Sequence, residues 1–97
     1  MVEITLEHAI LTQCTFDNAV LKSANLRHAN LTQSSFTHAV LLWVDMFRAT
    51  ARNCIFRHTS LARADMREGD FSNSDFTEAN LVDANLERAS FQCAKLA

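Results

Sequence analysis

A five-residue spacing decides the fold of this chain, and it is plainest in LTQCTFDNAVLKSANLRHANL (residues 11–31). A Leu or Phe stands at every fifth position of that stretch, and a small residue, usually Ala, precedes it by two positions. The spacing continues from Leu6 to Leu96 without insertion or deletion, and only Met46, Ala51 and Met66 replace the Leu or Phe. The apolar residues are therefore spaced two, then three, then two apart along the whole chain.

This spacing fits neither an amphipathic helix nor a long strand. A helix turns by about 100° per residue, so a step of five residues rotates each apolar side chain by roughly 140° and leaves no apolar face. A strand requires alternation with a period of two. A short extended piece followed by a corner satisfies the spacing, and its uninterrupted repetition winds a solenoid around a stack of side chains.

Similarities at a longer spacing predict how many corners make one coil. The stretch TQCTF (residues 12–16) returns as TQSSF, RNCIF and SNSDF, each copy twenty residues after the last. Like residues stack on like if four pentapeptides complete one coil, which predicts an all-β, four-sided solenoid of roughly five coils in one domain, residues 1–97. The predicted core stacks are Phe16, Phe36, Phe56 and Phe76, and Leu21, Leu41, Leu61 and Leu81.

Several motifs of the chain carry a family resemblance. They are SANLR (residues 23–27), HANLT (28–32), EANLV (78–82) and DANLE (83–87). They resemble the pentapeptide-repeat family, whose motif is Ala, then Asp or Asn, then Leu and two variable residues, and the resemblance covers the whole chain. It implies a right-handed, four-sided β-helix, with the handedness taken from the resemblance alone. It also implies a cyanobacterial source, since short chains of this kind are abundant in cyanobacteria.

The chain departs from the family motif at a few positions. Aliphatic residues replace the Asp or Asn at four of them, and a small residue replaces the central Leu or Phe at the fifth: Ile10, Val20, Val40, Ile55 and Ala51. We expect Ala51 to leave a gap in its stack unless Leu31 and Phe71 lean into it. The coil is therefore expected to be least regular from Leu42 to Ala51.

Composition narrows the class of protein. Eleven acidic and nine basic residues give a net charge of −2, which argues against a nucleic-acid binder with a basic face. The longest apolar run, residues 39–44, is too short to span a membrane, and the amino-terminal MVEITLEHA does not resemble a secretory signal. Three cysteines fit a reducing compartment, so a cytoplasmic protein is expected. One Gly and no Pro indicate that the turns are made by a regular device of another kind.

The cysteines do not predict a disulfide or a catalytic thiol. Cys14 and Cys54 share an inward column two coils apart, a distance of about 10 Å, whereas a disulfide needs Cα atoms within about 7 Å. Both are therefore expected to be small buried thiols. Cys93 lies at an outward position, where it is expected to be an idle surface thiol, with modification or a link between two chains as the alternatives.

The histidines pair by column, His8 with His28 and His38 with His58. Adjacent coils place each pair about 5 Å apart, which is close enough to share a zinc ion. Glu78 flanks the second pair, but no clear set of further ligands follows, so no metal site and no cofactor are predicted and zinc binding stays an alternative. No nucleophile, base and orienting group converge, so the chain is predicted not to be an enzyme.

Two kinds of surface are candidates for contact with a partner. The first is an outward apolar patch, in which Leu42 and Trp43 lie near Val20 and Val40, with Phe47 around the next corner. Two alternatives stay open for this region. Trp43 and Phe47 would cover the expected gap in the stack, or the register of the repeat would slip there.

The second kind of surface is formed by the two ends of the coil. Ile4 and Leu6 are already in phase with the repeat at one end, and Leu86, Phe91 and Leu96 keep the phase at the other. Solenoids generally need caps, and an open coil invites edge-to-edge association. We therefore expect a protein partner, either a second copy in a homo-oligomer such as a dimer or the adjacent part of a longer repeat array, and no direct contact with nucleic acid or membrane.

The sequence thus predicts a non-enzymatic structural or protein-interaction module that associates through its coil ends. The resemblance supplies one alternative, because some members of the family imitate duplex DNA and bind DNA gyrase. Acidic residues do gather in the last two coils, but arginines lie among them and the net charge of −2 is too small for a DNA mimic.

Overall fold

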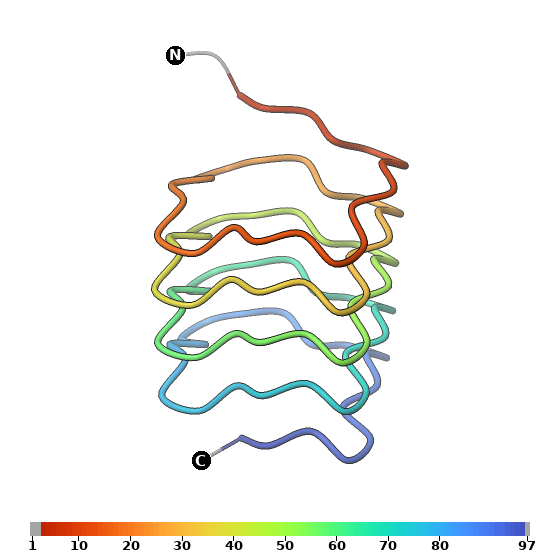
Figure 1. Ribbon diagram of the computed structural model, residues 1–97, viewed down its shortest axis with the longest axis vertical. Coiled ribbons are helices and arrows are strands. Elements are labelled where there is room, and N and C mark those ends of the chain that lie inside the picture. The colour runs from red at the N-terminus through yellow and green to blue at the C-terminus, as the bar shows by residue number, and fades with distance from the viewer. Residues whose placement is uncertain (1–2, 97) are drawn as a thin grey trace.

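The computed structural model describes residues 3–96, which wind into a stack of four-sided coils with the two ends of the chain at opposite ends of the stack (Figure 1). Every fifth residue forms a parallel β-bridge with the residue twenty positions later, from the pair Thr5 and Asn25 to the pair Asp75 and Lys95. Four pentapeptides therefore complete one coil, as the returning TQCTF motif predicts. The spacing does not change anywhere along the described chain.

Each side of a coil is extended for only a short distance. Within residues 3–96 the pairing consists of single bridged residues, and no run is long enough to be a continuous strand or a helix. The reason is that two residues of every five form the turn at a corner, which leaves one residue per side to pair with each neighbouring coil. No helix in the described part of the chain is long and apolar enough to cross a membrane.

The corners explain how the chain turns with one Gly and no Pro. The second residue after each central Leu or Phe has a φ between 56° and 65°, and none of these residues is Gly. This left-handed conformation at the third position is typical of a type II turn and costs an ordinary residue about 1–2 kcal/mol. Hydrogen bonds hold it in place: His28 N–H donates to Phe47 O of the next coil (2.9 Å), and Ala29 N–H donates to Leu26 O across the turn (3.1 Å).

The Asp or Asn of the repeat accepts a hydrogen bond from a backbone amide that has no backbone carbonyl as its partner. Four of the five amides in a typical pentapeptide donate to backbone carbonyls, and the fifth belongs to the residue just after the central Leu or Phe. The Asn or Asp two residues earlier accepts from it, as Asn25 Oδ1 does from Arg27 N–H (3.0 Å) and Asp65 Oδ1 does from Arg67 N–H (3.1 Å). These are Asx-turns, in which a side chain replaces a backbone acceptor. An aliphatic residue at this position, such as Val40, cannot supply the acceptor.

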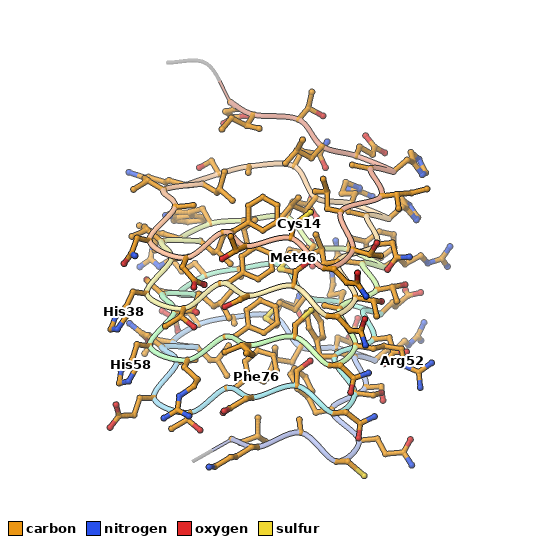
Figure 2. The ribbon with its side chains drawn as sticks, in the orientation of Figure 1. Cys14, His38, Met46, Arg52, His58 and Phe76 are labelled. Atoms are coloured by element: carbon orange, nitrogen blue, oxygen red, sulfur yellow. The ribbon has the colours of Figure 1, made fainter. Side chains whose placement is uncertain are left out.

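The core is a set of stacked columns inside the solenoid. The rings of Phe16, Phe36, Phe56 and Phe76 stack in order with centroid separations of 4.9, 5.1 and 4.8 Å. The last three rings are fully buried, whereas Phe16, in an outer coil, is partly buried. The leucine column shows the same gradient: Leu21, Leu41 and Leu61 are buried, and Leu81 is partly buried. Figure 2 shows Phe76 inside the solenoid, while His38, His58 and Arg52 project from it.

The region around Ala51 is regular, contrary to the expectation. The bridges of Asp45 with Asp65 and of Thr50 with Asp70 keep the register through it, so a slip of the repeat is excluded. Ala51 is fully buried, and residues 3–96 enclose no pocket. The expected gap therefore does not form a pocket within these residues. The large ring at the next position of the column, Phe71, lies inside at an angle of 67° to the Phe56 ring (centroids 6.2 Å apart).

Candidate interaction surfaces

The outer surface consists of four flat walls, which we name by a buried residue at the centre of each. The residues just before and just after a central residue project from the same wall, since Arg27 and Asp45 of adjacent coils form an ion pair of 3.2 Å on one wall. The next residue stands at the corner. The inward columns are those of the Leu26 wall (Leu6, Leu26, Met46, Met66, Leu86), the Leu31 wall (Leu11, Leu31, Ala51, Phe71, Phe91), the Phe36 wall (Phe16, Phe36, Phe56, Phe76, Leu96) and the Leu41 wall (Leu21, Leu41, Leu61, Leu81).

Two of the cysteines belong to an inward column in which hydroxyl groups link the coils. Ser34 Oγ accepts from Cys14 N–H (3.0 Å) and donates to Leu11 O (2.6 Å). Ser74 Oγ links Cys54 N–H (3.0 Å) and the carbonyl of Ala51 (2.7 Å) in the same way. A regular turn has a direct backbone hydrogen bond, such as the one from Ala29 N–H to Leu26 O. In the two cysteine turns, the serine hydroxyl of the next coil bridges the corresponding amide and carbonyl instead.

The environment of the thiols differs along the chain. Cys54 is buried and donates to Leu31 O (2.8 Å), and its burial raises the pKa of the thiol to about 11. Cys14 is partly buried, and Cys93 is exposed at a corner of the Leu31 wall. All three are free thiols. A buried thiol with a raised pKa is a poor nucleophile, so Cys54 contributes packing and a hydrogen bond rather than reactivity.

The histidine pairs form stacks at two corners. The rings of His8 and His28 lie 4.9 Å apart, those of His38 and His58 lie 4.8 Å apart, and both pairs are nearly parallel. Figure 2 shows the second pair one above the other at the edge of the molecule. His58 Nδ1 lies 2.9 Å from Glu78 Oε2. Across residues 3–96, however, no three His, Cys, Asp or Glu side chains are grouped so that they could hold a metal ion.

Phe47 lies on the Leu26 wall beneath three guanidinium groups. The Cζ atoms of Arg27, Arg48 and Arg67 are 4.8, 5.3 and 5.1 Å from its ring centroid. Each of these arginines is also paired with a carboxylate, for example Arg67 with Asp65 at 2.7 Å. Cation–π contacts of this kind contribute about 0.5–1 kcal/mol at exposed sites. The sequence placed Phe47 around the corner from Trp43, but its arginine cover was missed, although Arg27 and Arg67 flank it at the twenty-residue spacing.

The other predicted patch lies on the Leu41 wall and is larger than the sequence indicated. Leu42 and Trp43 project beside Val40, and Trp43 is 51% exposed with the Cζ of Arg63 5.0 Å from its ring centroid. The same wall also carries Ala62 and Val82, which the sequence analysis did not include. They follow Leu42 at the twenty-residue spacing, which is the signal that could have found them.

The coil edges expose apolar side chains that continue the core columns. Leu96, at the end of the Phe36 column, is 59% exposed, and Leu86, at the end of the Leu26 column, is 38% exposed. Phe91 is partly buried, with its ring stacked 5.4 Å from Phe71. At the other edge Ile4 is 43% exposed. Leu86, Phe91 and Leu96 come from three different walls and share one rim of the solenoid, whereas Ile4 lies at the opposite rim.

Most carboxylates of the later coils are paired with cations of neighbouring positions, and Glu87 is the exception within residues 3–96. The ion pairs are Asp65 with Arg67, Asp70 with Arg52, Asp75 with Arg57, Asp83 with Arg63, and Glu78 with His58 when that ring is protonated. Hydrogen bonds from Arg67, Ser72 and Thr77 hold the pKa values of Asp65, Asp70 and Asp75 below their usual range. The acidic residues of this region therefore do not form an uncompensated acidic surface.

Comparison with known proteins agrees with this architecture. The chain matches the family model of pentapeptide repeats in eight copies, over residues 1–37, 19–50, 45–81 and 70–97. It is similar to HetL, a pentapeptide repeat protein involved in heterocyst differentiation regulation from the cyanobacterium Nostoc sp. strain PCC 7120, with 32% identity, a TM-score of 0.96, and coverage of 97% of this chain and 40% of HetL. No curated protein matches the chain.

Two further solved structures are similar over most of the chain. A pentapeptide repeat protein of the Arabidopsis thaliana thylakoid lumen is 30% identical, with a TM-score of 0.51 and coverage of 90% of this chain and 61% of its own. QnrB1, a plasmid-mediated fluoroquinolone resistance protein, is 14% identical over 93% of this chain and 46% of its own, with a TM-score of 0.47. The chain thus spans less than two thirds of the length of each of these proteins. With its five-residue repeat and its right-handed, four-sided β-helix, this chain belongs to the pentapeptide repeat family.

Proposed function

We propose that this chain is a non-enzymatic protein-interaction module that associates through its coil edges. Its partner would be a second copy, giving a homo-oligomer such as a dimer, or the adjoining coil of a longer repeat array. The observation that carries the proposal is the exposure of Leu96 (59%) at the rim, in the same column as the fully buried Phe36 and Phe56. Leu86 and Ile4 support it in the same way.

The physical basis is the contrast between an inner and an outer coil. An inner coil buries its central side chains against both neighbours and pairs its backbone with both. An outer coil has one such neighbour, so its apolar side chains and part of its backbone face outward. Covering them stabilises the association by about 25 cal/mol for each Å² of apolar surface that is buried, and the exposed edge also offers backbone groups for pairing.

Support for a non-enzymatic role comes from the shape of the surface. Polar side chains stand on flat walls and are engaged in hydrogen bonds and ion pairs between coils, whereas catalytic sites are normally concave. The buried Cys54, with its raised pKa, favours a structural role for this thiol. The likeness to HetL favours a regulatory contact in a cyanobacterial cell as the setting, and the three free thiols are compatible with the cytoplasm.

The alternatives have less support. A DNA mimic that binds gyrase needs unpaired acidic charge, whereas four aspartates of the later coils, Asp65, Asp70, Asp75 and Asp83, are paired with arginines. A supercoiling assay tests this alternative directly, and inhibition of gyrase at micromolar protein would support it. Zinc binding would have to use a stacked pair such as His38 and His58, for which residues 3–96 supply no third ligand of the usual kind. A zinc-dependent rise in melting temperature that His38→Ala abolishes would support it.

The association is tested by light scattering coupled to size-exclusion chromatography, over an about hundredfold range of concentration. The wild-type mass should rise with concentration, and Leu96→Asp should lower it, because a charge would be buried at the rim. Ile55→Asp, at a partly exposed position in the middle of a wall, is the matched control and should leave the mass unchanged. A monomeric wild-type chain at every concentration would contradict association with a second copy.

A further inference from the structure

We propose that the Leu41 wall is a second contact surface, on which two copies of this chain pack face to face with their coil axes antiparallel. This goes beyond the association through coil edges and does not depend on it. Two observations carry it: the apolar character of this one wall and the distribution of charge over its four rows. The rows are residues 20–23, 40–43, 60–63 and 80–83, one from each successive coil.

The Leu41 wall is apolar along a diagonal. Val20 and Val40 stand in the column before the central leucines, and Leu42, Ala62 and Val82 stand in the column after them. Val20 is 68% exposed and Val82 is 62% exposed, so the diagonal is open at both of its ends. Trp43 continues it onto the corner. Val40, Leu42 and Ala62 between these ends are partly exposed, and an apolar strip of this kind on the surface is a common mark of a contact site.

The other three walls are different in chemistry. The Leu26 wall carries charged side chains around Phe47, such as Arg27 and Asp45. The Leu31 wall carries hydroxyl and amide groups, including the hydrogen-bonded corner pair Gln13 and Gln33 (2.9 Å). The Phe36 wall carries ion pairs and hydroxyl networks around its carboxylates. Aliphatic residues interrupt these walls singly, at Ile10 and Ile55, rather than in a strip: Ile10 lies on the Leu31 wall and Ile55 on the Phe36 wall.

Charge is distributed so that the wall complements itself in one orientation. The first row holds the cation Lys22, and the fourth row is bounded by two exposed anions. Asp83 stands at one corner, 3.8 Å from Arg63 of its own chain, and Glu78 stands at the other, 2.9 Å from His58. When two copies face each other with antiparallel axes, the first row of one copy meets the fourth row of the other. Lys22 then lies beside Asp83 of the second copy, and the contact occurs twice because the arrangement is two-fold symmetric.

The middle rows also match in this orientation. The second row of one copy meets the third row of the other, so Leu42 packs on Ala62, a large side chain on a small one. Trp43 faces Arg63 of the second copy, which repeats between copies the cation–π contact already present within one chain at 5.0 Å. With parallel axes, by contrast, each row meets itself, and Glu78 would face Asp83 of the second copy. The charges therefore select the antiparallel arrangement.

The size of the wall predicts a weak dimer. Four coils at about 4.8 Å each, with sides of five residues, make an area of about 300 Å² per copy, well under the roughly 800 Å² per partner of a standard interface. The association should therefore be sought at protein concentrations up to about 1 mM. Trp43 is the single tryptophan of the chain, so its fluorescence reports on this wall alone.

The experiment follows the wild-type chain by sedimentation equilibrium and Trp43 emission over the same concentrations. We expect a dimer to appear together with a blue shift of the emission, because the indole leaves water. Leu42→Glu should weaken the dimer at least about tenfold and remove the shift. Thr37→Glu, at the equivalent position of the Phe36 wall, is the matched control and should change neither reading.

A second pair of variants separates loss of contact from loss of folding. Val40→Asn places an acceptor where the repeat normally has one, for the amide of Leu42, so the folded monomer should not be destabilised. It should nevertheless weaken the dimer, since a polar group replaces an apolar one in the contact. Ile55→Asn makes the same change on the Phe36 wall and should leave the dimer intact.

A charge exchange tests the orientation. Lys22→Glu and Asp83→Lys should each weaken the dimer, and the double variant should restore it, because the two residues lie three coils apart within one chain and meet only between antiparallel copies. Failure of the double variant to restore the dimer would overturn the antiparallel arrangement. A wild-type chain whose Trp43 emission does not change with concentration would overturn the contact itself. If Leu96→Asp abolishes association while Leu42→Glu does not, the coil edge is the contact and the wall is not.

Discussion

The ring of Phe71 lies against Gly69 so closely that a Cβ atom on residue 69 would come within 2.5 Å of Phe71 Cε2 and 3.3 Å of the carbonyl oxygen of Ala49. The other members of this inward column are alanines, for example Ala29 and Ala89. The single Gly of the chain therefore makes room for a ring. That ring follows the small Ala51 in its own column and lies in the fully packed interior.

Gly69→Ala should destabilise the fold for a steric reason. Gly69 does not have a positive φ, so the cost is one of space, and overpacking of this kind is worth about 1–3 kcal/mol in the free energy of unfolding. Adding Phe71→Leu removes the atoms that the new methyl group meets, so the cost of the alanine should largely disappear in the double variant. Guanidinium denaturation of wild type, the two single variants and the double variant measures this coupling. Additive effects of the two substitutions would contradict a steric clash between residues 69 and 71.

Ser74→Ala should be costly because the hydroxyl serves two backbone groups. Its Oγ accepts from Cys54 N–H and donates to Ala51 O, and the residue is buried. Loss of the hydroxyl leaves both groups without their partner, which costs about 1–3 kcal/mol in the free energy of unfolding. Ser60→Ala, at an outward position, should change stability by less than about 0.5 kcal/mol. Equal effects of the two substitutions would show that the link between coils does not contribute.

Ile55→Asn should stabilise the fold by restoring the regular acceptor of the repeat. At the equivalent position of the next coil, Asp75 Oδ1 accepts from Thr77 N–H at 2.9 Å, whereas an isoleucine offers no acceptor to the amide of Arg57. An added hydrogen bond of this kind contributes about 0.5–1.5 kcal/mol. Thermal unfolding of Ile55→Asn and Ile55→Ala separates the effect of the new hydrogen bond from that of losing the isoleucine side chain. Only Ile55→Asn should raise the melting temperature.

The contribution of Asp65 to stability should depend on pH. Hydrogen bonding to Arg67 holds the pKa of Asp65 below its usual range in the folded state. The stabilisation is therefore complete above the unfolded-state pKa of about 3.9 and is lost as the pH falls through the lower folded-state value. Asp65→Asn keeps the Asx-turn, as Asn25 does in the same column, and removes only the charge. It should be less stable than wild type at neutral pH, by at most about 1 kcal/mol for a partly exposed pair, and the difference should shrink as the pH falls through the folded-state pKa of Asp65.

The three thiols should react with an aromatic disulfide reagent at different rates. Cys93 is exposed and should react first, Cys14 is partly buried and should follow, and Cys54 should react only as the chain unfolds. Burial raises the pKa of Cys54 to about 11, so the thiolate is scarce as well as inaccessible. Reaction rates of Cys→Ser variants, measured in native buffer and in denaturant, assign each phase. A fast native phase that Cys54→Ser removes would contradict the burial of this thiol.

The architecture of this protein follows from its sequence alone, because every pentapeptide places its inward residues in the same way. Inward residues two and three apart allow only a short extended piece and a corner, and the return of Phe16 at Phe36 sets four corners to a coil. The sequence also located the stacked histidines, since columns follow directly from a spacing of twenty residues. The sequence indicated only that the turns are regular and do not depend on Gly or Pro. Their left-handed φ values could not be predicted, because composition does not specify backbone angles.

The contacts that the side chains of these columns make became known from the structure. It showed that Phe71 lies where a Cβ atom on Gly69 would not fit, and that the expected gap at Ala51 does not form a pocket within residues 3–96. It covered Phe47 with arginines and left Trp43 half exposed, although both looked alike as outward aromatic residues. The physical reason is that a column fixes where a Cβ atom lies, whereas cover, charge pairing and fit depend on how long side chains bend toward their neighbours in adjacent coils.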